Sequence, residues 1–169
     1  NGESPVPIVA PQSPADCFDA TVMAARIAIT YRTPVFLLSD GYLANGSEPW
    51  CLPEVDSLPV IDPDFATKPN HETEDGSEEF WAYQRDPQTL ARPWAIPGTA
   101  GLEHRIGGLE KADGSGNISY DPENHDHMVR LRQAKVDAIA DTIVDIEVDD
   151  PGGVARILKL GWGSTNGAI

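Results

Sequence analysis

The sequence lacks the features that define several protein classes. No apolar run exceeds four residues, as at 35–38, whereas a membrane span needs roughly 20, so we expect no membrane-spanning segment. With two cysteines, Cys17 and Cys51, and no Cys-x-x-Cys motif, the chain cannot hold a [4Fe–4S] cluster by itself. Scarce cysteine favours a reduced, cytoplasmic protein. Basic residues are few, 12 against 27 acidic ones, and the net charge of −15 argues against a nucleic-acid partner.

Familiar catalytic and metal-binding motifs are also absent. There is no Gly-x-Ser-x-Gly, no His-Glu-x-x-His and no calcium-binding loop. His125 and His127 are two residues apart near a helix start, so they do not face each other, and no third ligand is close by in sequence. Residues 161–167 read Gly-x-Gly-x-x-x-Gly, one residue off the dinucleotide spacing; they predict a tight strand-to-helix turn, with anion binding as the alternative. None of these motifs therefore supplies a catalytic residue or a metal site within the chain.

Residues 6–43 show a strand–helix–strand pattern. The apolar run at residues 6–10 is too short for a helix, and Ser13, followed by a proline, is typical of a helix start. Residues 35–38 are apolar on both sides, which is typical of a parallel strand covered on both faces. Spacings of 4, 3 and 4 predict one buried helix face, made of Phe18, Val22, Ala25 and Ile29.

The loops that follow these two strands are the first candidate site. A strand, a helix and a second strand in this order form a right-handed parallel crossover. Ligands of such sheets bind beyond the carboxyl ends of the strands. Residues 11–13 and residues 39–42 occupy that edge, so any site in this part of the chain is expected there.

A long irregular segment follows. Residues 44–122 hold nine of the 15 prolines and show no sustained periodicity, and residues 72–79 carry five acidic residues and predict a solvated or disordered tip. Two explanations stay open: the segment crosses a partner surface, or it packs on the chain's own sheet. In either case the anchors are aromatic: Trp50, Phe80, Trp81, Tyr83 and Trp94.

Regular structure is expected again after this segment. Asp121, followed by a proline, is a second helix start. Residues 149–153 predict a break in the chain, and residues 157–160 predict a strand that opens another α/β domain. The predicted buried stripe of the intervening helix is Val129, Val136, Ile139 and Ile143.

Several sequence motifs resemble those of a known family, the alpha subunits of 2-oxoacid:ferredoxin oxidoreductases, and especially its actinobacterial 2-oxoglutarate branch. Residues 14–20 (Pro-Ala-Asp-Cys-Phe-Asp-Ala) and 31–43 are similar to the end of the family's pyrimidine-binding domain. Other matches follow in the family's order along nearly the whole chain. The connecting segment is matched by residues 94–98, 101–104 and 121–125, and the entry into the transketolase C-terminal-like domain by residues 132–135 and 160–165.

The resemblance implies a fold class and a division of the chain. The fold is α/β: the strand–helix–strand end of a thiamine-enzyme pyrimidine-binding domain, a long irregular linker, and the start of a transketolase C-terminal-like domain. The implied segments are the pyrimidine-binding part at 1–43, the linker at 44–120, a helix leading to the next domain at 121–149, and the start of that domain at 150–169. The chain is thus expected to be an internal fragment, inactive alone.

The resemblance also implies an activity. It is the oxidative decarboxylation of 2-oxoglutarate to succinyl-coenzyme A, with thiamine diphosphate as the electron sink, coenzyme A as co-substrate and ferredoxin as electron acceptor. The diphosphate, Mg²⁺ and the [4Fe–4S] cluster are expected mainly in a beta subunit, and the glutamate that contacts the aminopyrimidine is expected upstream of Asn1. Alternatives are pyruvate or a branched-chain 2-oxoacid as substrate, or a non-catalytic assembly module; an exposed sheet edge also allows self-association.

The family's motif positions give the candidate site residues. We expect two groups of residues to lie near the substrate entrance or the subunit interface, one at the sheet edge and one at a charged turn of the linker. They are Asp40, Gly41, Tyr42 and Asn45 at the edge, and Glu103, His104 and Arg105 at the turn.

Overall fold

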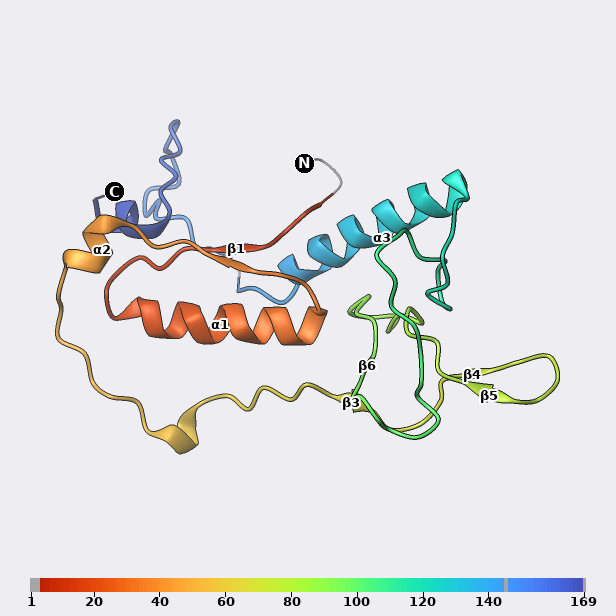
Figure 1. Ribbon diagram of the computed structural model, residues 1–169. Helices are drawn as coiled ribbons and strands as arrows, with labels where there is room; N and C mark the ends of the chain where they lie inside the picture. The colour runs from red at the N-terminus through yellow and green to blue at the C-terminus, as the bar shows by residue number, and fades with distance from the viewer. Residues whose placement is uncertain (1–3, 145, 169) are drawn as a thin grey trace.

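A computed structural model describes residues 4–144 and 146–168 (Figure 1). Parts of the expected segments, namely residues 1–3, 145 and 169, lie outside the described residues. The helices and strands are β1 (Ile8–Val9), α1 (Asp16–Tyr31), β2 (Phe36–Leu37), α2 (Gly41–Asn45), the 3₁₀ helix η1 (Val55–Ser57), β3 (Phe65–Ala66), β4 (His71–Glu72), β5 (Glu78–Glu79), β6 (Trp94–Ala95), α3 (Pro122–Ala140) and the 3₁₀ helix η2 (Gly163–Ala168).

The first unit is the predicted parallel crossover. β1 and β2 pair in parallel, with Ile8 opposite Phe36 and Val9 opposite Leu37, and α1 connects them (Figure 1). Each strand has only two residues within the pairing, so the described sheet is small. The mixed α/β character expected from the sequence is therefore confirmed.

Side chains hold both ends of α1. At the N-terminus the Ser13 hydroxyl accepts a hydrogen bond from the Asp16 N–H at 3.2 Å, as its place before a proline predicts. The Glu48 carboxylate, from the irregular segment, accepts from the Ser13 hydroxyl at 2.6 Å and from the Ala15 N–H at 2.8 Å. At the C-terminus the Arg32 guanidinium donates to the Ile29 carbonyl, and the Arg32 backbone, with φ of 50° in the left-handed region, caps the helix.

The buried face of α1 differs from the predicted one. The residues under 10 % exposed are Ala20, Ala24, Ile27 and Tyr31, and the prediction of Phe18, Val22, Ala25 and Ile29 is wrong. Both sets have spacings of 4, 3 and 4, because this helix is apolar on most of its circumference. The pattern therefore shows that a face is buried without deciding which one.

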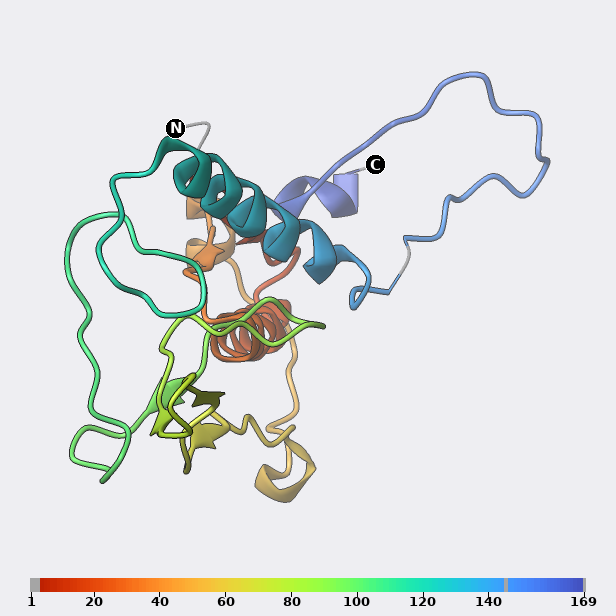
Figure 2. The same cartoon turned by 90° about the vertical axis from the view of Figure 1, so that its right-hand side faces the viewer.

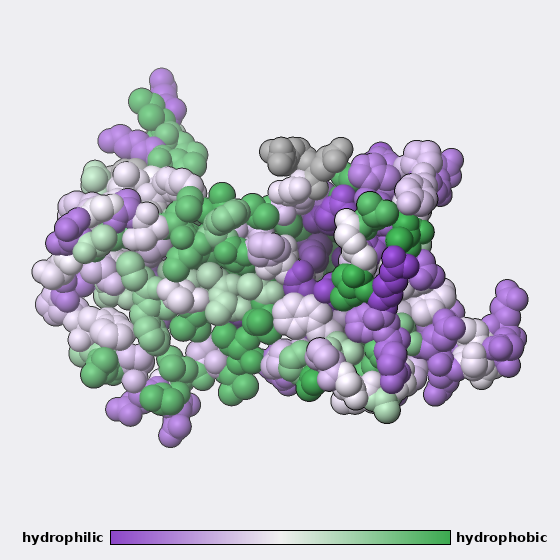
Figure 3. Space-filling view, viewed as in Figure 1, coloured by the Kyte–Doolittle hydropathy of each residue, from purple (hydrophilic) through white to green (hydrophobic). Residues whose placement is uncertain are grey.

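The sheet is not covered on both faces, contrary to expectation. Phe36 is 56 % exposed and Leu38 is 43 % exposed. Figure 3 shows hydrophobic side chains gathered over β1, β2 and α1, and hydrophilic ones towards α3 and the β4–β5 hairpin. The described residues place no further layer on this apolar surface, which explains the difference.

The irregular segment packs on itself and on the rest of the chain. Phe80, Ala82 and Leu102 form a second core, and Tyr83 packs against it. β3 pairs in parallel with β6, which carries Trp94. Phe80 and Tyr83 therefore pack within the irregular segment and not on the β1–β2 sheet, while Trp50, 46 % exposed, lies against the Phe18 ring of α1 with 5.4 Å between ring centroids. That the segment crosses a partner surface stays a prediction.

The acidic tip is an ordered hairpin. β4 and β5 pair antiparallel, and the turn between them is fastened by the Asp75 side chain. Hydrogen bonds donated by the hydroxyls of Thr73 and Ser77 lower the pKa of Asp75 to about 2. The carboxylate therefore stays charged near neutral pH and stabilises the turn, while the acidic side chains of Glu78 and Glu79 remain exposed.

α3 begins where the sequence predicts and ends earlier. The Asp121 side chain accepts from the Glu123 N–H at 3.0 Å, which confirms the helix start. The helix ends at Ala140, so the last residue of the predicted stripe, Ile143, lies beyond it. The buried residues are Met128, Lys135 and Ile139, of which only Ile139 was predicted. Ile139 packs with Ile27 and Tyr31 of α1.

The strand predicted at residues 157–160 is not formed. Figure 2 shows that residues 146–162 extend away from the body, and Figure 1 shows η2 beside α2. Ile157 and Leu160 are 81 % and 82 % exposed, and no described strand lies next to them. A strand needs a neighbour to satisfy its backbone groups, so this prediction is wrong for the chain as described. None of the described helices has the length and apolar character that crossing a membrane requires.

A glycine in the second core gives a test of this fold. Gly116 has φ of +75°, and a Cβ there would lie 2.6 Å from the Tyr83 ring. We expect Gly116→Ala to destabilise this region locally by about 1–3 kcal/mol, since it adds both strain and a clash. Hydrogen exchange of amides 111–118 in the full-length protein should accelerate, whereas Gly108→Ala, with open space and an ordinary φ, should leave it unchanged.

Candidate functional site

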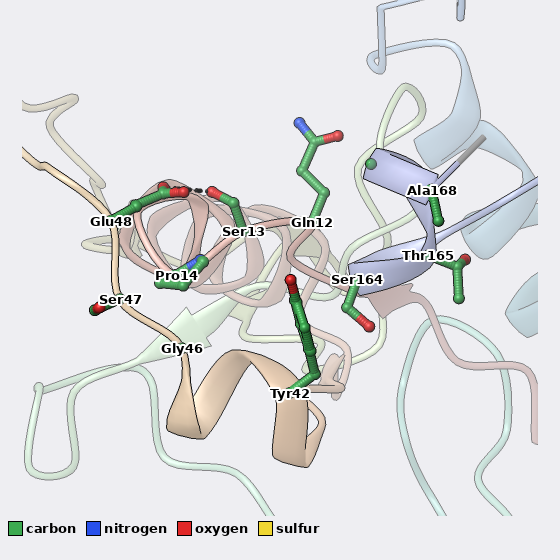
Figure 4. Close-up of a pocket in the computed structure, with 11 residues that line it drawn as sticks. Gln12, Ser13, Pro14, Tyr42, Gly46, Ser47, Glu48, Ser164, Thr165 and Ala168 are labelled. Atoms are coloured by element: carbon green, nitrogen blue, oxygen red, sulfur yellow. Dashed lines mark hydrogen bonds between the residues drawn. The ribbon is translucent and has the colours of Figure 1, made fainter.

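A hollow of about 560 Å³ lies at the carboxyl ends of β1 and β2, where the strand-end rule places a site (Figure 4). Three segments form it: the loop after β1, the α2 region after β2, and η2 from the end of the chain. Its wall is made of Gln12, Ser13, Pro14, Tyr42, Gly46, Ser47, Glu48, Ser164, Thr165, Gly167 and Ala168. Residues more than 110 positions apart in sequence thus share one edge of the sheet.

Asp40 joins η2 to α2. One oxygen of its carboxylate accepts from the Leu43 N–H at 3.0 Å and caps α2, while the other accepts from the Ser164 hydroxyl. These two hydrogen bonds, the one from Ser164 foremost, hold the pKa of Asp40 below its usual range. The predicted residue Asp40 therefore fixes the wall of the hollow.

The glycine-rich turn docks directly onto the strand ends. The Asn166 side-chain amide donates to the Gln12 side-chain oxygen at 2.5 Å. Gly163 has φ of +56°, and a Cβ there would lie 3.6 Å from the Pro11 carbonyl oxygen. The second glycine of the Gly-x-Gly sequence thus supplies a backbone conformation that other residues rarely adopt.

The remaining predicted residues at this edge have different surroundings. Tyr42 is 75 % exposed, and its ring rises from α2 between Gln12 and Ser164 (Figure 4). Asn45 donates from its amide to the Gly41 carbonyl at 2.7 Å, within α2. Tyr42 alone of the four lines the hollow, while Asp40 and Asn45 hold the helix that presents it.

Glu103, His104 and Arg105 lie in a separate hollow of about 370 Å³. His104 donates from Nδ1 to the Leu102 carbonyl at 2.8 Å, and its ring meets the Phe80 ring edge-on at 4.9 Å between centroids. The two hollows share no lining residue. The structure therefore brings the predicted residues together in two groups, and not in one site.

Sequence reasoning missed Glu48 as a part of this site. It is the acceptor that joins the irregular segment to Ser13 and Ala15 at the hollow. The hollow combines this carboxylate with the hydroxyls of Ser13, Ser164 and Thr165, so it suits the binding of a polar group. Glu48 stands in a stretch without periodicity, so no sequence signal identified it.

The described residues do not build a metal or iron–sulfur site. No group of three or more His, Cys, Asp or Glu side chains within 4–144 and 146–168 could hold a metal ion. His125 Nδ1 lies 2.6 Å from a Glu110 carboxylate oxygen, and His127 Nε2 lies 3.0 Å from one of Asp113. These histidines fasten the irregular segment to the first turns of α3.

Comparison with known proteins gives a family and a set of relatives. The profile of the pyruvate flavodoxin/ferredoxin oxidoreductases, thiamine-diphosphate-binding, matches residues 2–121. Over its whole length the chain is 61 % identical to 2-oxoglutarate oxidoreductase subunit KorA of Mycobacterium tuberculosis, of which it covers 24 %. Over 87 % of its length it is 28 % identical to 2-oxoglutarate synthase subunit KorA of Methanothermobacter thermautotrophicus, of which it covers 36 %.

A solved structure is similar in fold. The 2-oxoglutarate:ferredoxin oxidoreductase from Magnetococcus marinus, with 2-oxoglutarate, coenzyme A and succinyl-CoA bound, aligns over 95 % of this chain with a TM-score of 0.70 and 30 % identity. The match covers 26 % of that chain. The chain therefore spans between about a quarter and a third of the lengths of the relatives it matches.

The hydrogen bond from Ser164 to Asp40 gives a pH-dependent prediction. Ser164→Ala should raise the pKa of Asp40 towards its usual value, because the largest stabiliser of the carboxylate is lost. The folded-state pKa is lowered, so in the unaltered chain this contact stabilises η2 above the unfolded pKa of roughly 3.9 and is lost as pH falls through the folded pKa.

A carbon-13 NMR titration of the Asp40 carboxyl measures this shift. Thr165→Ala is the matched control, because among the described residues the Thr165 hydroxyl bonds only to the Trp162 backbone, within its own turn. An Asp40 pKa that is the same in the Ser164→Ala variant as in the unaltered chain would refute the assignment.

Proposed function

The chain belongs to the pyruvate flavodoxin/ferredoxin oxidoreductase family, and we propose that it is part of the alpha subunit of an enzyme that converts 2-oxoglutarate to succinyl-coenzyme A with ferredoxin as electron acceptor. One observation carries the proposal: 61 % identity, over the whole chain, to a 2-oxoglutarate oxidoreductase subunit. Identity this high is difficult to reconcile with a change of reaction class. The related structure with bound 2-oxoglutarate, coenzyme A and succinyl-CoA supports the same substrate and product.

The proposed cofactors divide between subunits. Thiamine diphosphate would act as the electron sink of the decarboxylation, and the match to a thiamine-diphosphate-binding family supports its presence. The described residues do not fit a Mg²⁺ site, and the two cysteines are too few for a [4Fe–4S] cluster. We therefore assign Mg²⁺ and the cluster to a partner beta subunit, which would also pass electrons to ferredoxin.

This chain then serves to bind the beta subunit and to shape the substrate entrance. The sheet-edge hollow offers hydroxyls and a carboxylate with Tyr42 at its rim, and we assign it to the substrate entrance or to the contact with the beta subunit. Glu103, His104 and Arg105 form a second polar hollow, which we assign to the same interface at another point. Both cysteines are free thiols, which supports the reduced environment of the cytoplasm.

An electron-transfer assay tests the proposed function. The full-length protein, co-expressed with its beta subunit, should reduce viologen only when both 2-oxoglutarate and coenzyme A are present. Activity with pyruvate or a branched-chain oxoacid in place of 2-oxoglutarate would support the proposed reaction class and show that the proposed substrate is wrong. A cluster-loaded complex without reduction of viologen would leave a non-catalytic assembly module as the function.

Substitution of His104 tests the second hollow. In the full complex His104→Ala should lower turnover several-fold, because it removes the imidazole, whose ring nitrogens can donate or accept a hydrogen bond in this hollow. The His127→Ala variant is the control, since that histidine of α3 pairs with Asp113 of the irregular segment, outside this hollow. Unchanged kinetics in a normally assembled His104→Ala complex would show that residues 103–105 are a surface turn without a role in catalysis.

A further inference from the structure

Basic side chains gather at one place in this acidic protein. Arg32, Arg85 and Arg92 line a hollow of about 500 Å³ between the end of α1 and the irregular segment. Lys135 of α3 approaches the same place and donates to the Arg32 carbonyl at 3.3 Å. With Arg132, these are five of only 12 lysines and arginines in a chain of net charge −15.

The cluster is held together against electrostatic repulsion. Lys135 is 8 % exposed, and its burial, together with Arg85, Arg92 and Arg132, lowers its pKa to about 8. Among the described residues, no carboxylate oxygen lies within 4.0 Å of a side-chain nitrogen of Lys135, Arg85 or Arg92. Buried charges are normally paired, so an anion is the expected complement.

Three carboxylates line the hollow: Asp64 is the largest attractive charge on Arg32, while Asp62 and Asp86 are already engaged by backbone groups. Asp86 accepts from the Gln88 N–H at 3.0 Å and from the Thr89 N–H at 2.7 Å, and it also accepts from the Thr89 hydroxyl. Asp62 accepts from the Asp64 N–H at 2.8 Å. They moderate the positive potential of the hollow without pairing with Arg85 or Arg92.

The three arginines differ in how much of their hydrogen-bonding capacity is used. Arg32 donates to the Ile29 and Pro63 carbonyls and lies over the Trp94 ring, so its role is structural. Arg85 makes one bond, to the Leu90 carbonyl at 2.8 Å, and its buried Nε has no partner among the described residues.

Arg92 has the most free capacity. Its guanidinium lies 5.5 Å from the centre of the Tyr83 ring, and the structure gives it no hydrogen bond to any of the described residues. A guanidinium presents donors in a planar fork that matches phosphate, so Arg85 and Arg92 together are suited to a phosphate group.

We propose that this hollow, between Arg85 and Arg92 with Lys135 behind them, is an anion site that binds a phosphate group. The hollow lies away from the sheet edge and shares no lining residue with the hollow there. Its volume accommodates a group as large as pyrophosphate. The anion neutralises the repulsion that the clustered cations impose on the contact between α3 and the irregular segment.

Pyrophosphate binding to the full-length complex tests the site, at constant ionic strength so that screening does not vary. Isothermal titration should give saturable binding that Arg92→Gln weakens about tenfold, or about 1.4 kcal/mol. Arg85→Gln should weaken it similarly. Arg26→Gln, which removes an exposed arginine of α1 outside the hollow, should leave it unchanged.

The outcomes are distinct. Absence of saturable binding, or equal weakening in the Arg26→Gln variant, would overturn the proposal. Melting temperatures without ligand verify that each variant folds; since Arg92 makes no hydrogen bond to the described residues, its variant is expected to melt like the parent. Binding is measured without turnover, so failure here and failure of the proposed function are separable.

A competition arm identifies the source of the phosphate. Coenzyme A carries phosphate groups and is bound in the related structure, so it is titrated against bound pyrophosphate and its displacement is measured. Displacement that is lost in Arg92→Gln would assign the hollow to a phosphate of the co-substrate. Saturable pyrophosphate binding that coenzyme A does not disturb would assign it to the free anion.

Discussion

The fold depends on the contacts of Arg32, the residue at which three segments meet. It ends α1 with a left-handed backbone, and its guanidinium donates to carbonyls of α1 and of the irregular segment. Trp94 of β6 lies against that guanidinium at 4.4 Å, and Lys135 of α3 donates to its carbonyl. Helix, irregular segment and second helix are thus joined through one residue that provides donors, an acceptor and a cation.

Local signals predicted the elements that local chemistry controls. The parallel crossover and the cap at Asp121 follow from short-range patterns, and both are present. The buried face of α1 did not follow, because apolar residues occur on most sides of that helix. The strand at residues 157–160 failed for another reason: a strand forms only with a partner, and the described chain supplies none there.

Topology predicted the part of the candidate site at the sheet edge, whereas the charged turn was identified only through the family resemblance and Glu48 was not identified at all. Asp40 and Tyr42 follow a strand end, so topology alone places them at a ligand-binding edge. Glu48 reaches the same edge through the irregular segment, and Glu103 and His104 reach another hollow by the same route. The irregular segment has no periodicity, so the spacing of its residues does not predict where their side chains lie in the folded structure.

Order in the irregular segment has a physical source other than a buried stripe. Its carbonyls at Pro63 and Leu90 accept hydrogen bonds from Arg32 and Arg85, and its ring at Tyr83 faces Arg92. A guanidinium donates at fixed angles, so the hydrogen bonds of Arg32 and Arg85 restrict the backbone of this segment. A segment without helical or strand periodicity can therefore hold one conformation, and Arg85, one of the cations that hold it, also lines the proposed anion site.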